Sequence, residues 1–285
     1  MMTAPAGKAI ADDTARAYAG ASSLAPSFDG VTPVAPASAP AEPIVRIDHV
    51  SKRFGSGPLV IDDVSLDIAP GEFVCLLGAS GCGKSTLLNL IAGLEPVTSG
   101  AISVPSTGAA VMFQESALMP WLTARRNVEL ALRLRGVPRS ERREEALRLL
   151  GTVNLADAGD KRPHELSGGM RQRVALARAL AQDRPVLLMD EPFAALDAIT
   201  RDLLHEELER VWRATGRTIV FVTHNVREAA RLGQRVILLS SRPGRIAREW
   251  KLGGTAGRRI ESPEVSALAA EITTELREEI RRNAA

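Results

Sequence analysis

Hydrophobic positions in this chain gather into four short runs, which are separated by longer stretches of helical periodicity. Runs of four or five apolar residues are typical of strands buried on both faces. The four runs are residues 73–77, 186–189, 218–222 and 236–239. Helical patterns lie between them at about 85–94, 200–214 and 225–232. This alternation predicts an α/β fold with a mainly parallel sheet covered by helices on both faces.

Two other regions follow different patterns. Residues 44–47 and 65–68 alternate apolar and polar side chains, which is typical of half-buried antiparallel strands. Helical patterns at 128–134 and 141–150 are separated by Pro138, because proline interrupts a helix. The chain is therefore expected to carry an antiparallel part and a helical part beside the main sheet.

Composition narrows the class of protein. Of 285 residues, 36 are Lys or Arg and 34 are Asp or Glu, so the net charge of +2 gives no reason to expect nucleic acid as a partner. Cys75 and Cys82 are the two cysteines, and their number without a secretory signal fits a reducing compartment. No run of about 20 apolar residues is present, as a membrane span would need. If this protein works at a membrane, it is expected to dock onto another subunit.

A phosphate-binding loop follows the first apolar run. The pattern G-x-x-x-x-G-K-[ST] is matched by Gly78, Ala79, Ser80, Gly81, Cys82, Gly83, Lys84 and Ser85. Glycines let backbone N–H groups converge on phosphate oxygens, and the following helix presents its positive end. We expect Lys84 to reach the β- and γ-phosphates of ATP, Ser85 to place its hydroxyl on Mg²⁺, and Thr86 to complete the nucleotide-binding set.

Two carboxylates end the second apolar run. Asp190 is delivered to the carboxyl edge of the sheet, where ligands bind in such folds. We expect Asp190 to hold Mg²⁺ directly or through a water. Glu191 points the other way and is expected to polarise an attacking water.

An octet with the sequence LSGGMRQR occupies Leu166–Arg173, before a helix expected from about 170 to 181. Ser167 is a favourable N-cap residue, and Gly168 and Gly169 expose backbone N–H groups. This segment therefore predicts a second helix start that can bind phosphate.

With this octet between the phosphate loop and the Asp190-Glu191 strand end, the chain strongly resembles the ATP-binding-cassette (ABC) ATPase family. The resemblance covers about residues 44–250. It implies a P-loop NTPase fold with a RecA-like, mainly parallel sheet, an antiparallel β subdomain and a helical subdomain at about 115–182. It also implies that Glu191 is the general base. Two copies of the chain would sandwich two ATP molecules, each copy presenting its Ser167-Gly168-Gly169 segment to the ATP held by the other.

Four single residues match positions that this family uses. Gln114 resembles the glutamine at the hinge to the helical subdomain, where it could sense Mg²⁺ or water. His224 resembles the histidine that contacts the γ-phosphate, and Asp197 lies in a segment similar to the loop that crosses the dimer interface. Phe54 stands where the family places an aromatic ring against adenine, although a core phenylalanine is the alternative.

Three segments are similar to ATPase subunits of the nitrate, sulfonate and taurine importers: Phe113–Thr123, Glu191–Asp197 and Ser241–Ile246. The resemblance implies a peripheral subunit at the cytoplasmic face of the inner membrane. Two copies would sit on a permease dimer, and an extracytoplasmic binding protein would deliver the solute. A permease helix could dock near Trp121, with local core packing as the alternative. An exporter ATPase subunit and a soluble ABC ATPase acting on ribosomes or DNA are the rival functions, and the solute itself stays open.

The domain organisation follows from these patterns. Residues 1–43 are rich in Ala and Pro without apolar periodicity and are interpreted as a flexible extension. Residues 44–254 form one ATPase domain, because only one phosphate loop is present. Residues 255–285 form a tail, in which apolar side chains recur at helical spacing between 263 and 282.

Overall fold

The computed structural model describes residues 42–253 and 258–282. The expected flexible extension of residues 1–43 lies outside the described residues, apart from its last two positions. All elements below belong to the described part of the chain.

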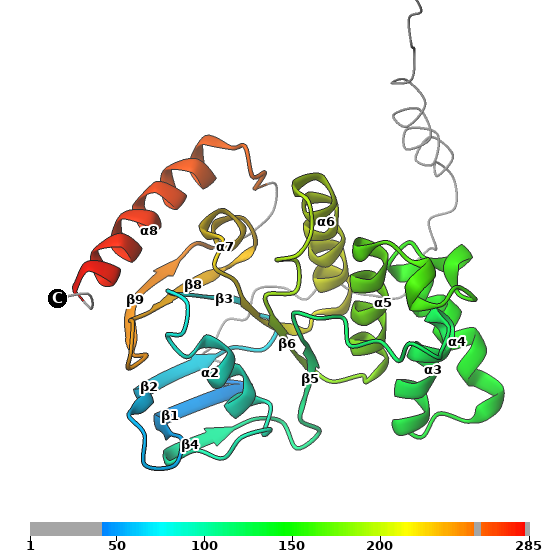
Figure 1. Cartoon of the computed structure of the whole chain (residues 1–285), viewed down its shortest axis with the longest axis horizontal. Helices are drawn as coiled ribbons and strands as arrows, with labels where there is room; N and C mark the ends of the chain where they lie inside the picture. The colour runs from blue at the N-terminus through cyan, green and yellow to red at the C-terminus, as the bar shows by residue number, and fades with distance from the viewer. Residues whose placement is uncertain (1–41, 254–257, 283–285) are drawn as a thin grey trace, which may run out of the picture. The chain divides into compact units, whose positions relative to one another are not determined.

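A six-stranded sheet forms the centre of the described chain, in the order β5-β6-β7-β3-β8-β9 (Figure 1). Its strands are β5 (Ala109–Met112), β6 (Val186–Asp190), β7 (Thr218–Val222), β3 (Phe73–Leu77), β8 (Arg235–Leu239) and β9 (Ile246–Lys251). Every neighbouring pair is parallel except β8 and β9, which are antiparallel. The predicted α/β class and the four apolar strands are confirmed. The edge strand β9 was not predicted.

A smaller antiparallel sheet has the order β2-β1-β4. It comprises β2 (Leu59–Ile68), β1 (Val45–Arg53) and β4 (Ser99–Ser103). The two alternating segments of the sequence lie in β1 and β2, where one face is buried and the other exposed. β4 was not predicted, because four of its five residues are exposed and it carries little apolar signal.

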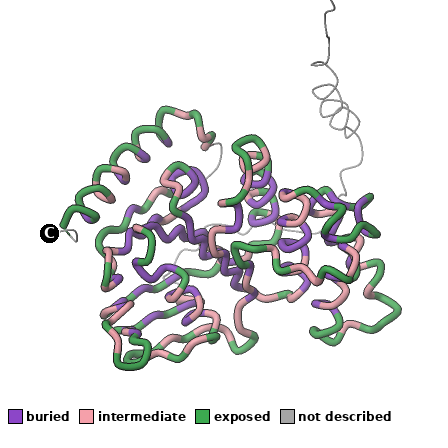
Figure 2. The backbone as a smooth tube through the Cα atoms, in the orientation of Figure 1, coloured by how far each residue is buried: buried purple, intermediate pink, exposed green. Residues whose placement is uncertain are grey.

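Two hydrophobic cores lie on opposite faces of the six-stranded sheet, because alternate side chains of a strand point to opposite faces. Phe73, Cys75 and Leu77 of β3 join one core, whereas Val74 and Leu76 join the other. The first core also holds residues of α5 (Gly168–Ala181), α6 (Ala198–Thr215) and α7 (Val226–Leu232). The second holds residues of α2 (Lys84–Ile91) and the antiparallel sheet. Figure 2 shows the central strands as the most continuously buried part of the chain.

Helices α3 (Ala124–Leu134), α4 (Arg139–Thr152) and α5 pack together to one side of the sheet (Figure 1). Two short 3₁₀ helices, η1 (Ala156–Ala158) and η2 (Pro163–Glu165), connect α4 to α5. The hydroxyl of Thr123 caps α3 by accepting a hydrogen bond from the Arg126 N–H.

Helix α8 (Pro263–Arg282) is the amphipathic helix that the C-terminal pattern predicts. Val265, Ala269 and Ile272 are buried, and α8 packs against α7. Trp250 of β9 donates a hydrogen bond of 2.9 Å to the Glu271 carboxylate of α8. The helix is therefore attached to the domain through both apolar and polar contacts.

Candidate active site

The sheet order brings together the chain segments that were singled out from the sequence. Parallel strands share one carboxyl edge, and ligands bind outside that edge in open α/β sheets. The phosphate loop follows β3, Asp190 ends β6, His224 follows β7, and Gln114 follows β5. All four segments therefore start from the same edge of the sheet.

The phosphate loop is a tight turn between β3 and α2. Gly83 has φ of 102°, and a side-chain carbon at this position would lie 2.6 Å from Ile61 Cδ1. Only glycine meets both conditions without strain. The phosphate loop therefore passes close to strand β2 at Gly83. We expect the side of the loop that faces away from β2 to contact the ligand.

Lys84, at the start of α2, is held inside the phosphate loop. Its side chain is buried, and Nζ donates hydrogen bonds to the carbonyl oxygens of Gly78 at 2.9 Å and Ala79 at 3.0 Å. An ammonium group and a helix N-terminus thus lie together. This combination attracts the anionic phosphates of a nucleotide.

Asp190 has the features of a cation ligand. Burial raises the pKa of its carboxyl group, and the nearby charge of Glu191 adds to this, whereas a hydrogen bond with Ser85 and the charge of Lys84 lower it. Its Oδ1 atom is buried without a hydrogen-bond partner. Such an atom is costly unless a ligand satisfies it. Asp190 and the Ser85 hydroxyl therefore fit Mg²⁺, which prefers few protein ligands together with phosphate oxygens.

No group of three or more His, Cys, Asp or Glu side chains within 42–253 and 258–282 is arranged to hold a metal ion. A site made of Asp190, Ser85 and nucleotide oxygens is consistent with that finding, because it needs only one carboxylate from the protein.

Glu191 is held in a strained backbone conformation. Its φ is 43°, which is uncommon for a residue other than glycine and is often found at functional sites. Its N–H donates to the Val222 carbonyl at 3.0 Å, and its Oε2 lies 2.8 Å from His224 Nδ1. The two side chains form a pair in which the imidazole can orient the carboxylate. Such a carboxylate could position a water molecule and take its proton.

The LSGGMRQR octet presents a helix start to solvent. α5 begins at Gly168, and the exposed residue Ser167 caps it by accepting a hydrogen bond from the Met170 N–H at 3.3 Å. Asp197 caps α6 in the same way through the Thr200 N–H at 2.9 Å, and this hydrogen bond lowers the pKa of Asp197. A carbon added at Gly169 would lie 2.5 Å from Thr200 Cγ2, so the two helix starts are in contact.

Gln114 is exposed, and its segment is tied to α5 through backbone atoms. Gln172 donates from Nε2 to the Gln114 carbonyl at 2.8 Å, and Arg178 donates to the carbonyl oxygens of Ser116 and Ala117. Sequence reasoning did not assign roles to Gln172 or Arg178. Gln172 could have been found from the sequence, because it lies inside the octet, whereas Arg178 lies outside it.

Phe54 is 48% exposed, so it is not a core residue. Lys52 Nζ lies 4.6 Å from the centre of its ring, within the range of a cation–π contact. Lys52 is itself buried and is bound to Glu95 and to the Pro96 carbonyl. The ring is therefore supported from the protein side and accessible to a planar ligand.

A buried polar network beneath these loops was not predicted. Glu228 of α7 accepts a hydrogen bond from Thr223, the residue before His224, and lies 3.0 Å from His205 Nε2. Arg201 Nε lies 3.6 Å from Glu228, and Arg201 also donates to the carbonyl oxygens of Phe193 and Leu196. The network therefore connects the chain on either side of His224 with the segment that leads to Asp197.

Burial by itself would raise the pKa of Glu228. The hydrogen bonds from His205 and Thr223 and the charges of His205 and Arg201 outweigh it, so that the pKa is lowered. Glu228 is thus held as a carboxylate at the centre of the network.

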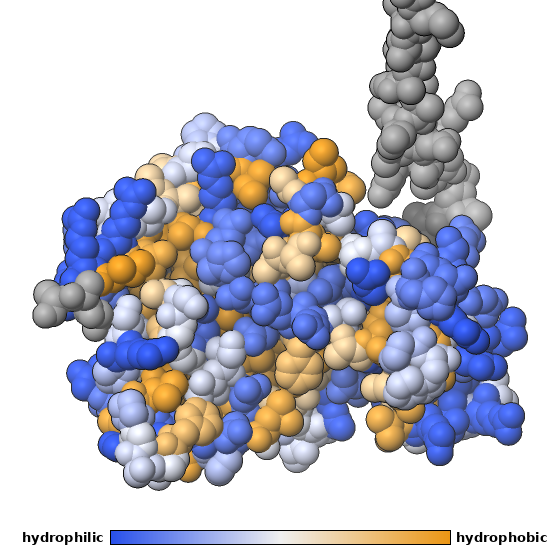
Figure 3. Space-filling model, viewed as in Figure 1, coloured by the Kyte–Doolittle hydropathy of each residue, from blue (hydrophilic) through white to orange (hydrophobic). Residues whose placement is uncertain are grey.

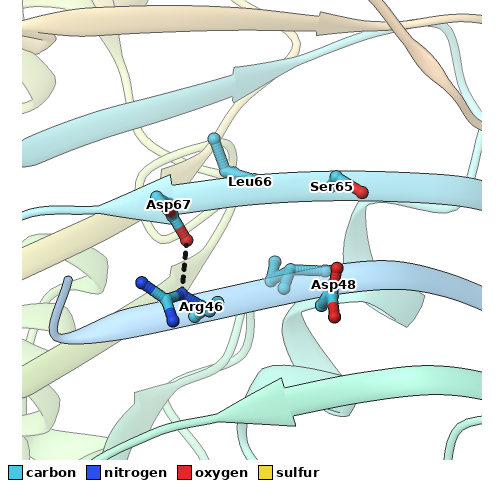
Figure 4. Close-up of a pocket in the computed structure, with 6 residues that line it drawn as sticks. Arg46, Asp48, Ser65, Leu66 and Asp67 are labelled. Atoms are coloured by element: carbon cyan, nitrogen blue, oxygen red, sulfur yellow. Dashed lines mark hydrogen bonds and ion pairs between the residues drawn. The ribbon is translucent and has the colours of Figure 1, made fainter.

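A shallow hollow of about 410 Å³ lies over β1 and β2, lined by the Arg46–Asp67 ion pair, Asp48 and Ser65 (Figure 4). It contains none of the site residues above.

Figure 3 shows hydrophobic surface in several separate places on one face. Trp121 is 68% exposed and Phe113 is 42% exposed, which rules out core packing for the Trp121 ring. None of the described helices has both the length and the hydropathy that a membrane span requires.

The sequence of this chain is similar to those of known proteins. A family model described as "ABC transporter" matches residues 61–194. The taurine import ATP-binding protein TauB of Chromobacterium violaceum is 46% identical over 245 residues, which cover 80% of this chain and 94% of that protein. TauB of Burkholderia pseudomallei is 50% identical over 216 residues, covering 73% of this chain and 82% of that protein.

A solved ATP-binding cassette, in a dimeric post-hydrolysis state bound to ADP and Pi, is similar in structure. Its TM-score is 0.64 at 36% identity, and the match covers 74% of this chain and 99% of that chain. A dimeric bacterial ABC transporter cassette gives a TM-score of 0.65 with the same identity and coverage.

Proposed function

This chain belongs to the ABC transporter family of ATP-binding ATPases, and from that premise we propose that it is the ATP-hydrolysing subunit of an importer for a small anion or organic solute of the nitrate, sulfonate or taurine type. The observation that carries the proposal is the convergence of Lys84, Asp190 and Glu191 at one sheet edge, on a chain that is similar to TauB over most of its length.

ATP would bind with its phosphates on the Gly78–Ser85 loop. Backbone N–H groups and the start of α2 would contact the phosphate oxygens, and Lys84 Nζ would exchange its two carbonyl partners for the β- and γ-phosphates. Thr86, on the first turn of α2, would line the same site. The adenine would stack on the exposed face of Phe54, opposite Lys52.

Ser85, Asp190 and Gln114 would hold Mg²⁺. When bound, the ion would neutralise charge that develops during phosphoryl transfer. The unpartnered Oδ1 atom of Asp190 supports this assignment.

Glu191 would act as the general base. Its carboxylate would accept a proton from a water molecule while the water oxygen attacks the γ-phosphorus, and the bond from that phosphorus to the bridging oxygen of ADP would break. His224 would keep the carboxylate oriented through the contact of 2.8 Å and would reach the γ-phosphate from its exposed position. The strained backbone of Glu191 supports a functional role.

The second half of each site would come from another copy of the chain. Ser167, Gly168 and Gly169 would contact the γ-phosphate of the ATP held by the partner copy, and Asp197 would cross the interface beside them. The exposure of Ser167 and Asp197, and the contact of Gly169 with Thr200 that joins the two helix starts, favour this arrangement. ATP binding would then close the dimer, and hydrolysis would reopen it.

A permease would receive this motion on the cytoplasmic side of the membrane, and an extracytoplasmic binding protein would supply the solute. The exposed Trp121 ring, close in sequence to Gln114, is suited to a short permease helix. We expect Trp121→Ala to weaken co-purification of the permease while ATP binding is unchanged. Undiminished co-purification would contradict this docking site.

The test of the proposed function is purification of the tagged chain from gently solubilised membranes of its native host. We expect a multi-span permease to co-purify, and the associated binding protein to bind taurine or a related sulfonate in a direct binding assay. A soluble ribosomal or DNA-bound partner would overturn the importer assignment, and only the ATPase activity would remain.

A further inference from the structure

The loop between β8 and β9, residues 240–245, has no role in the function described so far. It contains most of the segment Ser241–Ile246, which resembles importer ATPases in sequence. The loop is internally rigid, because Ser240 N–H donates to the Arg245 carbonyl at 2.8 Å, and the Ser240 hydroxyl donates to the Pro243 carbonyl at 2.7 Å. Arg245 N–H returns a hydrogen bond of 2.9 Å to the Ser240 hydroxyl.

The last two residues of this loop, Gly244 and Arg245, are fixed to strand β2. Gly244 N–H donates to the Val60 carbonyl at 2.8 Å, and Asp62 N–H donates to the Gly244 carbonyl at 3.0 Å. The guanidinium group of Arg245 forms an ion pair with Asp62, with Nε at 2.9 Å from Oδ2. The loop is therefore held from one side by the antiparallel sheet.

Its other side touches the phosphate loop. A side-chain carbon added at Gly244 would lie 2.2 Å from the Cys82 carbonyl oxygen, so the two backbones are in direct contact. Arg242 donates from Nε to the Gly81 carbonyl at 3.3 Å, and a carbon added at Gly81 would lie 2.8 Å from Arg242 Nη2. The phosphate loop thus lies between its ligand site and the 240–245 loop.

These contacts are made to the carbonyl side of the phosphate loop. A peptide unit is planar and trans, so a carbonyl held on one side turns the next N–H to the opposite side. Arg242 holds the Gly81 carbonyl, and Gly244 packs on the Cys82 carbonyl. Both contacts therefore restrict the rotation of the Gly81–Cys82 and Cys82–Gly83 peptide units, and the first unit is also held by its own N–H, which donates to the Ala79 carbonyl at 3.3 Å. Ordering these units only when phosphate binds would cost free energy.

We propose that residues 240–245 brace the phosphate loop from outside, and that Arg242 and Gly244 are positioning residues for ATP. The proposal rests on ATP binding at Gly78–Ser85, as described above. A phosphate loop that is held in its binding conformation before ATP arrives binds ATP more tightly. Removing the contacts that hold it therefore lowers the affinity for ATP and leaves the rate of the chemical step unchanged.

The test compares Arg242→Ala with Arg242→Lys and with the matched control Arg248→Ala. Arg248 is an exposed arginine on β9 that pairs with Glu271 and Glu275 of α8. Three measurements are made on each full-length variant. The Kd for ATP is measured in the presence of EDTA, KM and kcat are measured with MgATP, and Tm is measured without nucleotide. We expect Arg242→Ala to raise Kd and KM by about three- to tenfold, the effect of losing an exposed charged hydrogen bond, with kcat and Tm unchanged. Lysine should recover part of the affinity, and Arg248→Ala should leave it unchanged.

A second variant addresses the backbone contact. Gly244→Ala is expected to raise Kd further than Arg242→Ala, because the added carbon must displace the Cys82 carbonyl. The proposal is overturned if Kd is unchanged in both variants, if kcat falls while KM stays constant, or if Arg248→Ala has an equal effect on Kd. Failure of the wild-type chain to bind ATP would instead contradict the proposed function.

Discussion

The two regions that bind phosphate in the proposed function are built in different ways. The phosphate loop makes its contacts within its own chain. Lys84 is buried and paired with loop carbonyls, and the 240–245 loop packs behind it. The octet segment faces outward, with Ser167 and Asp197 exposed and Ile199, at the start of α6, 76% exposed. We refer to them as the inner half-site and the outer half-site.

The difference indicates where each half-site finds its partners. Polar groups of the inner half-site come from one continuous segment of the chain, so a single chain can bind a ligand there by itself. The outer half-site combines two capped helix starts with an exposed apolar side chain, which is typical of a surface that meets another protein. One chain would therefore bind ATP alone and require a second copy for hydrolysis.

The largest expected effect comes from removing the proposed general base, Glu191, which lies at the same sheet edge as the inner half-site. Glu191→Gln keeps the size of the side chain but cannot accept a proton, so we expect turnover to fall by at least about 100-fold while ATP binding is retained. ATP should then hold the variant as a closed dimer, detectable by size-exclusion chromatography. Hydrolysis at the wild-type rate would remove Glu191 from its proposed role.

A mixing experiment separates the two half-sites. Lys84→Ala should lose ATP binding, since a buried cation at the phosphates is gone. Gly168→Asp adds a negative charge that a helix start tolerates but that repels phosphate. We expect it to keep ATP binding by the monomer and to lose turnover at least about fivefold, because a like charge a few ångströms away costs on the order of 1–4 kcal/mol.

Equal amounts of the two variants, mixed, should recover activity. Half of the dimers formed would carry both kinds of chain, and each of these would contain one intact site, so about a quarter of wild-type turnover is expected if the sites act independently. No recovery would mean that the octet acts within its own chain, and the distinction between inner and outer half-sites would fail.

Sequence patterns predicted the parts of this molecule that are determined locally. β3, β6, β7 and β8 follow from apolar runs because both faces of those strands are buried. Ser167 was correctly predicted as an N-cap from its residue type and the following glycines. β9 was not predicted, because most of its side chains are exposed at the sheet edge.

The geometry of the site could not be read from the sequence in the same way. The resemblance supplied identities such as Lys84 and Glu191, but their partners depend on tertiary contacts. Arg242 meets Gly81 across 161 positions of the chain, and Glu228 meets His205 across 23. No local pattern encodes contacts of that kind.

The Glu228 network supports the segment before His224 and the segment that leads to Asp197, and its loss should destabilise the fold. Glu228→Ala would leave Arg201, His205 and Thr223 without their carboxylate, and we expect a loss of about 3 kcal/mol in the free energy of unfolding. Glu228→Gln keeps the hydrogen bonding and should cost less. Urea unfolding at neutral pH measures both.

The pH dependence of this contribution has a defined sign. Because the folded pKa of Glu228 is lowered, its stabilisation is present above the unfolded value, near 4.3, and is lost as the pH falls through the folded pKa. The stability of the wild type should therefore fall more steeply in acid than that of Glu228→Gln. Equal slopes would show that Glu228 is not a stabilising carboxylate.

The smallest expected effect on stability separates two roles of Asp197 in the outer half-site. As an N-cap, Asp197 can be replaced by asparagine at almost no cost, whereas Asp197→Ala should lower Tm by no more than about 2–4 °C. The pKa of Asp197 is lowered by the Thr200 hydrogen bond, so its capping charge is lost only as the pH falls through that lowered value. If Asp197 also crosses the dimer interface, Asp197→Asn should reduce ATP turnover although Tm is unchanged. Turnover that follows Tm in both variants would leave Asp197 as a helix cap alone, and the outer half-site would then consist of the octet segment without it.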